Sequence, residues 1–118
     1  MDTIFVENLQ IIGKHGVLGH EWSHEQRFLV DIRVETDTAH AGETDDLAAS
    51  INYVELCDIA KRIIQGDSVY LIEKLAGNIA AEILKNPLAL HVAVTIRKPS
   101  VLPNGVPGVT VVRTQTHT

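Results

Sequence analysis

The stretch Gln26–Thr36, with the sequence QRFLVDIRVET, decides the fold of this 118-residue chain. Apolar and charged residues alternate along it, and the apolar set occupies every second position: Phe28, Val30, Ile32 and Val34. Because successive side chains of a β-strand point to opposite faces, this period of two predicts a strand with one buried face. Only Leu29 interrupts the alternation, so we predict a half-buried strand over the whole stretch.

The rest of the chain is expected to add three strands and two helices. The further strands are predicted over residues 1–12, 92–96 and 109–112. A capping pattern at Asn52, followed by apolar residues at helical spacing, predicts a helix that runs to about Ile64. A second helix is predicted to start after Ser68 and to end at Asn86. The polar stretch Thr38–Ser50 is expected to be a connection.

The predicted order of these elements is ββααββ, within a single domain over residues 1–118. Strands and helices that are segregated along the chain favour an α+β fold, in which an antiparallel sheet carries two helices on one face. The other face and the edges of the sheet remain available for assembly. A domain of this size buries a limited core, so a pocket between subunits is easier to build than a deep pocket within one chain.

The charge and the cysteine content limit the partners and the location. Lys and Arg number 10 against 15 Asp and Glu, which gives a net charge of −5, and the basic residues form no run. Nucleic acid and anionic membranes both need a basic surface, so neither is expected as a partner. Cys57 is the single cysteine, and its helical context predicts a small buried residue. The chain shows neither a leader nor an apolar run of membrane length, so we expect a cytoplasmic protein.

Familiar metal and cofactor motifs are not found in the sequence. Six histidines are present, but His20 and His24 lie in a Gly-rich region that gives no helical face, and we predict no metal site. The nucleophile motif GxSxG is missing, as are the Gly-rich motifs that hold dinucleotides or nucleoside triphosphates. The sequence therefore indicates neither a metal site nor a dinucleotide or nucleoside triphosphate site of these types.

Four polar residues are candidates for a site, although each has a more ordinary explanation. Glu73 lies in the first turn of the second predicted helix, where the helix dipole favours a carboxylate that could accept two N–H donors from a guanidine-like ligand edge. Tyr53 begins the first helix, Glu21 lies in a Gly-rich loop, and Lys98 ends the third strand. Each also has a common explanation without a function. The two carboxylates could simply be solvated, the tyrosine could pack against its neighbours, and the lysine could protect a strand edge from aggregation.

The candidates occur within five short motifs that, in this order, resemble those of the dihydroneopterin aldolase family. The motifs are Asp2-Thr3-Ile4-Phe5 with Gly16-Val17, Glu21 and Gln26-Arg27-Phe28; Thr44-Asp45-Asp46; Ile51-Asn52-Tyr53; Leu71-Ile72-Glu73-Lys74-Leu75-Ala76; and Val94-Thr95-Ile96-Arg97-Lys98-Pro99. The resemblance covers essentially the entire chain. Two positions depart from the family pattern, and both lie in loops. Glu25 stands where the family commonly has glycine, and Val101-Leu102-Pro103 replaces a proline-rich run.

The resemblance implies a role for each candidate in binding a pterin. Glu73, helped by the main chain of Ile72, would hold the aminopyrimidinone edge. Tyr53 would reach the site from a neighbouring subunit and handle a proton near the reacting carbon. Glu21 would contact the substrate from its loop.

Lys98 is implied to move protons in a retro-aldol reaction. The family cleaves 7,8-dihydroneopterin between C1′ and C2′ to 6-hydroxymethyl-7,8-dihydropterin and glycolaldehyde. The pterin's own N5=C6 imine accepts the electrons once N5 is protonated, so no cofactor, metal or Schiff base is implied. To act as a base, Lys98 must lose its proton more readily than lysine in water, through desolvation or a nearby charge such as Arg97. As a cation it could instead donate to N5.

The resemblance also implies a tunnelling fold, in which four subunits close their sheets into a barrel and two such rings stack. The expected partners are thus further copies of the chain, in a tetramer or an octamer, and a pterin substrate.

Three other functions stay open at this stage. The same residues could epimerise C2′ of dihydroneopterin or of its triphosphate by cleavage and re-addition, although a triphosphate would need a basic patch. An oxygenase outcome is disfavoured by Tyr53, because it occurs chiefly where this tyrosine is absent. A non-catalytic pterin-binding oligomer would need Glu73 but neither Lys98 nor Tyr53.

Overall fold

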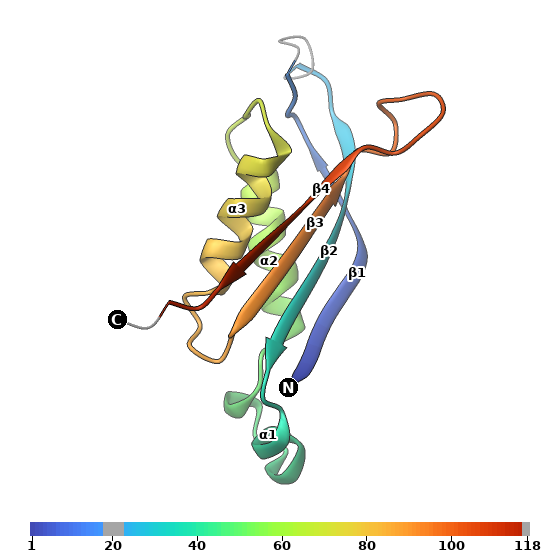
Figure 1. Cartoon of the computed structure of the whole chain (residues 1–118). Helices are drawn as coiled ribbons and strands as arrows, with labels where there is room; N and C mark the ends of the chain where they lie inside the picture. Colours follow the sequence, from blue (N-terminus) through green and yellow to red (C-terminus); the bar gives the residue numbers. More distant parts are fainter. Residues whose placement is uncertain (18–22, 117–118) are drawn as a thin grey trace.

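The structure, a computed structural model, describes residues 1–17 and 23–116. Four strands form one antiparallel sheet in the order β1-β2-β3-β4, and two long helices cover one of its faces (Figure 1). The strands are β1 (Asp2–Gly13), β2 (Gln26–Thr36), β3 (His91–Arg97) and β4 (Gly108–Thr114), and the long helices are α2 (Tyr53–Ile64) and α3 (Ile72–Ile83). The predicted α+β fold is therefore confirmed, with its long elements in the order ββααββ.

The connection between β2 and α2 is more ordered than predicted. It contains a short helix, α1 (Ala39–Thr44), and a 3₁₀ turn, η2 (Leu47–Ala49). Asp45 ends α1 with a positive φ of 58°, and the side chain of Asp46 caps η2 by accepting the N–H of Ala48 at 3.0 Å. None of the described residues of α1 or η2 is buried, so the sequence carries no apolar periodicity that would reveal them.

The long helices differ from the prediction in detail. Asn52 caps α2 by accepting the N–H of Val54 at 2.9 Å, which satisfies one of the donors that every helix start leaves unpaired. The start of α3 was placed too early, because this helix begins only at Ile72. Cys57 is half-buried rather than buried, since it lies beside the buried stripe of α2 and not on it. None of the described helices is long and apolar enough to cross a membrane.

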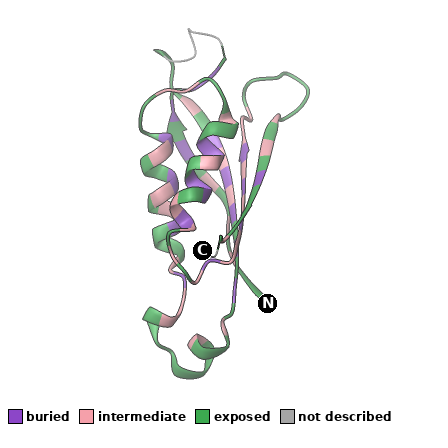
Figure 2. Cartoon of the chain, turned by 60° about the vertical axis from the view of Figure 1, so that its left-hand side comes forward, coloured by how far each residue is buried: buried purple, intermediate pink, exposed green. Residues whose placement is uncertain are grey.

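The core is one layer of apolar side chains between the helices and the sheet (Figure 2). Every second residue of β2 and β3 is fully buried in it: Phe28, Val30, Ile32, Val34, Val92, Val94 and Ile96. The helices add buried residues at helical spacing: Leu56, Ala60 and Ile64 from α2, and Leu75, Ala76, Ile79, Ala80 and Ile83 from α3. Burying one Val, Leu, Ile or Phe side chain contributes roughly 1.5–3 kcal/mol, so this layer holds the helices on the sheet.

The end of β1 lies directly against the end of α2. A Cβ atom added at Gly13 would lie 2.8 Å from both the carbonyl oxygen and the Cγ2 atom of Ile64. Only glycine fits at this position, because a main-chain carbonyl in a packed helix cannot move aside cheaply.

We predict that Gly13→Ala lowers the free energy of unfolding by roughly 1–3 kcal/mol, since the added methyl overpacks this contact. Gly42→Ala is the matched control: nothing lies within 4 Å of its Cβ position in α1, and its stability should stay the same or rise. Urea unfolding of both variants at one protein concentration measures the difference. Equal stability of the two variants would show that the contact is not tight.

Candidate active site

The start of α3 and the end of β3 lie at the same end of the fold. Their opposite ends are joined by the short turn 84–90, which the side-chain amide of Gln115 holds by donating to the carbonyls of Leu84 at 2.8 Å and Ala89 at 3.1 Å. The two elements then run in opposite directions along each other (Figure 1). Any residue at the start of α3 is therefore near the level at which β3 ends.

Lys98 follows the last residue of β3 and continues its hydrogen-bonding ladder. Its N–H donates to the carbonyl of Pro107 at 2.9 Å, across the base of the 99–107 loop. The side chains of Val94 and Ile96 point to the helix side, and the alternation extended by one step places Lys98 on that side too. Lys98 is half-buried, so part of its aliphatic stem is covered while it stays accessible to solvent.

Glu73 and Ile72 occupy the first turn of α3. Ile72 packs partly against the core, whereas the side chain of Glu73 is exposed. The N-cap residue is Leu71, which has no polar atom in its side chain with which to cap the helix. This end of α3 thus combines the positive end of a helix dipole with a carboxylate, an arrangement suited to a ligand edge rich in N–H groups.

Tyr53 lies at the opposite end of the fold. It is the first residue of α2, directly after the α1–η2 connection, and its side chain is 62% exposed. The start of α2 and the start of α3 lie at opposite ends of the fold (Figure 1). The seven residues of β3 separate the two ends by roughly 20 Å, since a strand rises about 3.3 Å per residue. One chain therefore brings Glu73 and Lys98 to one end and leaves Tyr53 far from both. Glu21, the fourth candidate, lies outside the described residues.

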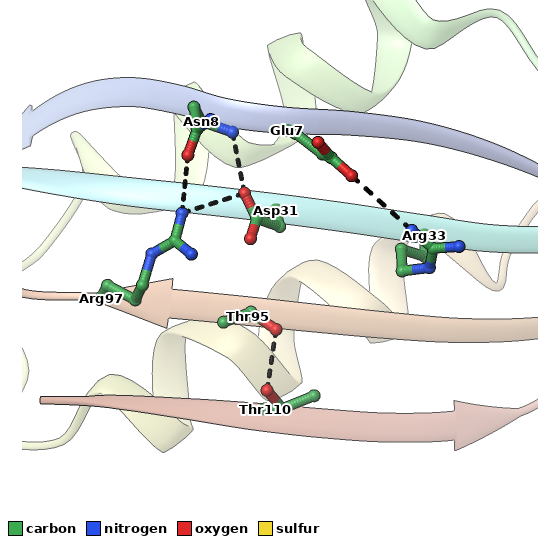
Figure 3. A network of polar contacts seen from close by, with 7 residues as sticks. All are labelled: Glu7, Asn8, Asp31, Arg33, Thr95, Arg97 and Thr110. Carbon is green, nitrogen blue, oxygen red and sulfur yellow. Dashed lines mark hydrogen bonds and ion pairs between the residues drawn. The ribbon is translucent and has the colours of Figure 1, made fainter.

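Arg97 precedes Lys98 but faces the open side of the sheet. Its guanidinium donates to Oδ1 of Asn8 at 2.9 Å and to Oδ1 of Asp31 at 3.2 Å, and the N–H of Asn8 donates to the same Asp31 oxygen at 2.8 Å (Figure 3). Asn8 adopts a positive φ of 57° where the pairing of β1 with β2 shifts, which indicates a β-bulge. The charge of Arg97 is paired with a carboxylate on the face opposite Lys98.

Further polar contacts continue across this open face of the sheet. The guanidinium of Arg33 lies 3.8 Å from a carboxylate oxygen of Glu7, and the hydroxyls of Thr95 and Thr110 are 2.8 Å apart (Figure 3). The same guanidinium lies 5.2 Å from the ring centre of Phe5. The sequence does not predict this network of contacts. The alternating charged positions of β2 indicate a solvent-facing side of the sheet, but no sequence pattern reveals the bulge that brings Asn8 to Asp31.

Known proteins resemble this chain both in sequence and in fold. The family model described as "Dihydroneopterin aldolase" matches residues 4–114. A Bacillus subtilis dihydroneopterin aldolase is 45% identical over 84 residues, which cover 71% of this chain and 70% of the relative. Dihydroneopterin aldolase 2 of Arabidopsis thaliana is 35% identical over 101 residues, covering 85% of this chain and 77% of the relative.

Among solved structures, the E. coli dihydroneopterin aldolase in complex with neopterin is 28% identical and superposes with a TM-score of 0.86, covering 96% of this chain and 99% of that one. The architecture is thus that of the tunnelling fold, four antiparallel strands with helices on one face. The chain belongs to the dihydroneopterin aldolase family.

We predict that Asp31 and Arg97 are coupled by less than about 1 kcal/mol, because their side chains are 22% and 31% exposed and solvent screens the pair. A double-mutant cycle with Asp31→Ala, Arg97→Ala and the double variant, followed by urea unfolding, measures this coupling. A coupling energy above about 2 kcal/mol would show that the network behaves as a buried ion pair.

Proposed function

We propose that this chain cleaves 7,8-dihydroneopterin by a retro-aldol reaction to 6-hydroxymethyl-7,8-dihydropterin and glycolaldehyde, in a site shared by two copies. One observation supports the shared site. The start of α3, with Glu73, and the end of β3, before Lys98, lie at the same end of the fold, whereas the exposed Tyr53 begins α2 at the other end. Family membership supports the reaction, since the matching relatives are carbon–carbon lyases by name.

Substrate binding is proposed for the start of α3. The exposed carboxylate of Glu73 would accept two parallel N–H bonds from the aminopyrimidinone edge of the pterin, and the main chain of Ile72 would complete that edge. The E. coli relative was solved in complex with neopterin, which supports a pterin as the ligand class. Glu21 would contact the substrate from its loop.

Proton transfer is proposed for Lys98 and Tyr53. A proton leaves the 2′-hydroxyl, the C1′–C2′ bond breaks, and its electron pair moves into the N5=C6 imine as N5 takes up a proton. The enamine is then protonated at C1′ and N5 loses its proton, so the reaction needs no redox partner. Lys98, half-buried directly after β3, would shuttle these protons, and the Tyr53 hydroxyl of a second copy would act near the reacting carbon.

The contacts of Arg97 bear on the proposed role of Lys98. Arg97 was an expected source of positive charge, but its guanidinium is paired with Asp31 on the opposite face of the sheet. Arg97 therefore places its charge in the polar network of the open face and not in the site proposed around Lys98.

Assembly is proposed to complete the site. In the described part of the chain, β1 pairs with β2 alone and β4 with β3 alone, so each presents an unpaired edge. Pairing of these edges between copies would join the sheets of four subunits into a ring, and two rings would give an octamer.

Lys98→Ala should lower the rate of glycolaldehyde formation by at least about a hundredfold while neopterin affinity changes only a few-fold, because a proton shuttle acts in the transition state. Turnover measured by glycolaldehyde release, together with fluorescence titration of neopterin, separates the two effects. The same assay, with chromatography of the pterin products, detects any C2′ epimer. Lost binding with unchanged turnover of bound substrate would contradict the proposed role.

Subunits that carry Lys98→Ala and subunits that carry Tyr53→Phe should restore activity when combined. If each site takes Lys98 from one copy and Tyr53 from another, about a quarter of the sites in randomly mixed oligomers contain both native residues. Co-expression with two different tags, tandem purification and the glycolaldehyde assay give the measurement. Co-expressed copies that all carry Lys98→Ala are the control. Mixed oligomers no more active than this control would place the whole site within one chain.

A further inference from the structure

His15 is one of two buried polar residues in the described part of the chain, and its side chain is 1% exposed. Its ring packs edge-on against Phe28, with centres 5.6 Å apart. Both ring nitrogens face main-chain groups: Nδ1 lies 3.1 Å from the nitrogen of Val69, and Nε2 lies 2.6 Å from the carbonyl oxygen of Ile64. The N–H of Val69 can only donate and the carbonyl of Ile64 can only accept, so Nδ1 is the acceptor and Nε2 the donor in these contacts.

These contacts join three separate segments. Ile64 is the last residue of α2, and its carbonyl is one of those that a helix end leaves unpaired. Val69 lies in the link between α2 and α3, where it also accepts the N–H of Gly16 at 3.1 Å through its carbonyl. The side-chain amide of Gln26, at the start of β2, donates to the carbonyl of His15 at 3.0 Å.

Residues 15 and 16 therefore hold both main-chain polar groups of Val69. This matters for Glu73, because Leu71 gives α3 no side-chain cap and Glu73 follows Val69 by four residues. The N–H bond to His15 and the carbonyl bond to Gly16 fix the main chain two residues before the N-cap and so anchor the approach to the helix.

We propose that His15 is a positioning residue for pterin binding: its Nδ1 atom fixes Val69 and, through Val69, the direction in which the first turn of α3 presents Ile72 and Glu73. The inference rests on the proposed function of Glu73. It assigns His15 no contact with the substrate and no part in proton transfer.

Three substitutions of His15 distinguish the hydrogen bond made by Nδ1 from the one made by Nε2. His15→Asn keeps an acceptor near the position of Nδ1 and loses the donor to Ile64. His15→Gln keeps a donor near Nε2 and loses the acceptor for Val69, and His15→Phe keeps the packing against Phe28 and loses both.

We expect the KM for 7,8-dihydroneopterin and the dissociation constant of neopterin to rise about tenfold in the Gln and Phe variants, the effect of one lost hydrogen bond, with kcat close to that of the native chain. The Asn variant should stay within about threefold of the native values. Val34→Ala removes buried volume from β2 away from this junction, so it should lower thermal stability without changing KM.

Amide hydrogen exchange gives a second readout that does not depend on activity. Exchange in residues 66–73 should accelerate in the Gln and Phe variants and stay slow in the Asn variant. Equal KM and exchange effects in all three variants, or unchanged exchange in Gln and Phe, would overturn the positioning role. Failure of the native chain to cleave or bind, with this exchange pattern intact, would overturn the proposed function and leave the anchoring of Val69 in place.

Discussion

The burial of one face of the sheet under two helices is the constraint on which the rest of the molecule depends. The inward residues of β2 and β3 are fully buried, so a shift of either strand by one residue would turn its whole apolar set towards water. The register of the strands also determines which helix ends and strand ends lie at the same end of the fold. It sets the start of α3 beside the end of β3 and sends α2 in the opposite direction, with Tyr53 at the far end.

The polar contacts of the structure lie around this layer and serve a different purpose. On the open face, Asn8, Asp31 and Arg97 tie three strands together at the Lys98 end of the sheet. On the helix side, His15 ties the end of α2 to the link before α3. Neither set supplies most of the stability, since solvent screens the half-buried pair of Asp31 and Arg97 and each hydrogen bond contributes about 1 kcal/mol net. They fix the relative positions of the segments that they join.

The sequence predicted the elements that carry strong periodicity and missed those that do not. The bounds of β2 and the end of α2 at Ile64 are confirmed, because alternate or helical burial is written directly into their residues. The helix α1 and the turn η2 were missed since their described residues bury nothing. Glu73 and Lys98 were proposed from motif resemblance, whereas their common end of the fold follows from pairing and direction, which single residues do not encode. His15 gave no signal, because a buried and a surface histidine look alike in a sequence.

The separation of Tyr53 from Lys98 and Glu73 along the length of one subunit has a consequence for how such a protein behaves on dilution. If each site needs two copies, the specific activity is set by mass action between subunits as well as by substrate concentration. The enzyme would then lose turnover per chain below the dissociation constant of the assembly, even though every chain remained folded. The amount of protein expressed would then control the rate of the reaction per chain. A substitution that only weakens the subunit contacts would abolish activity although every catalytic residue is still present.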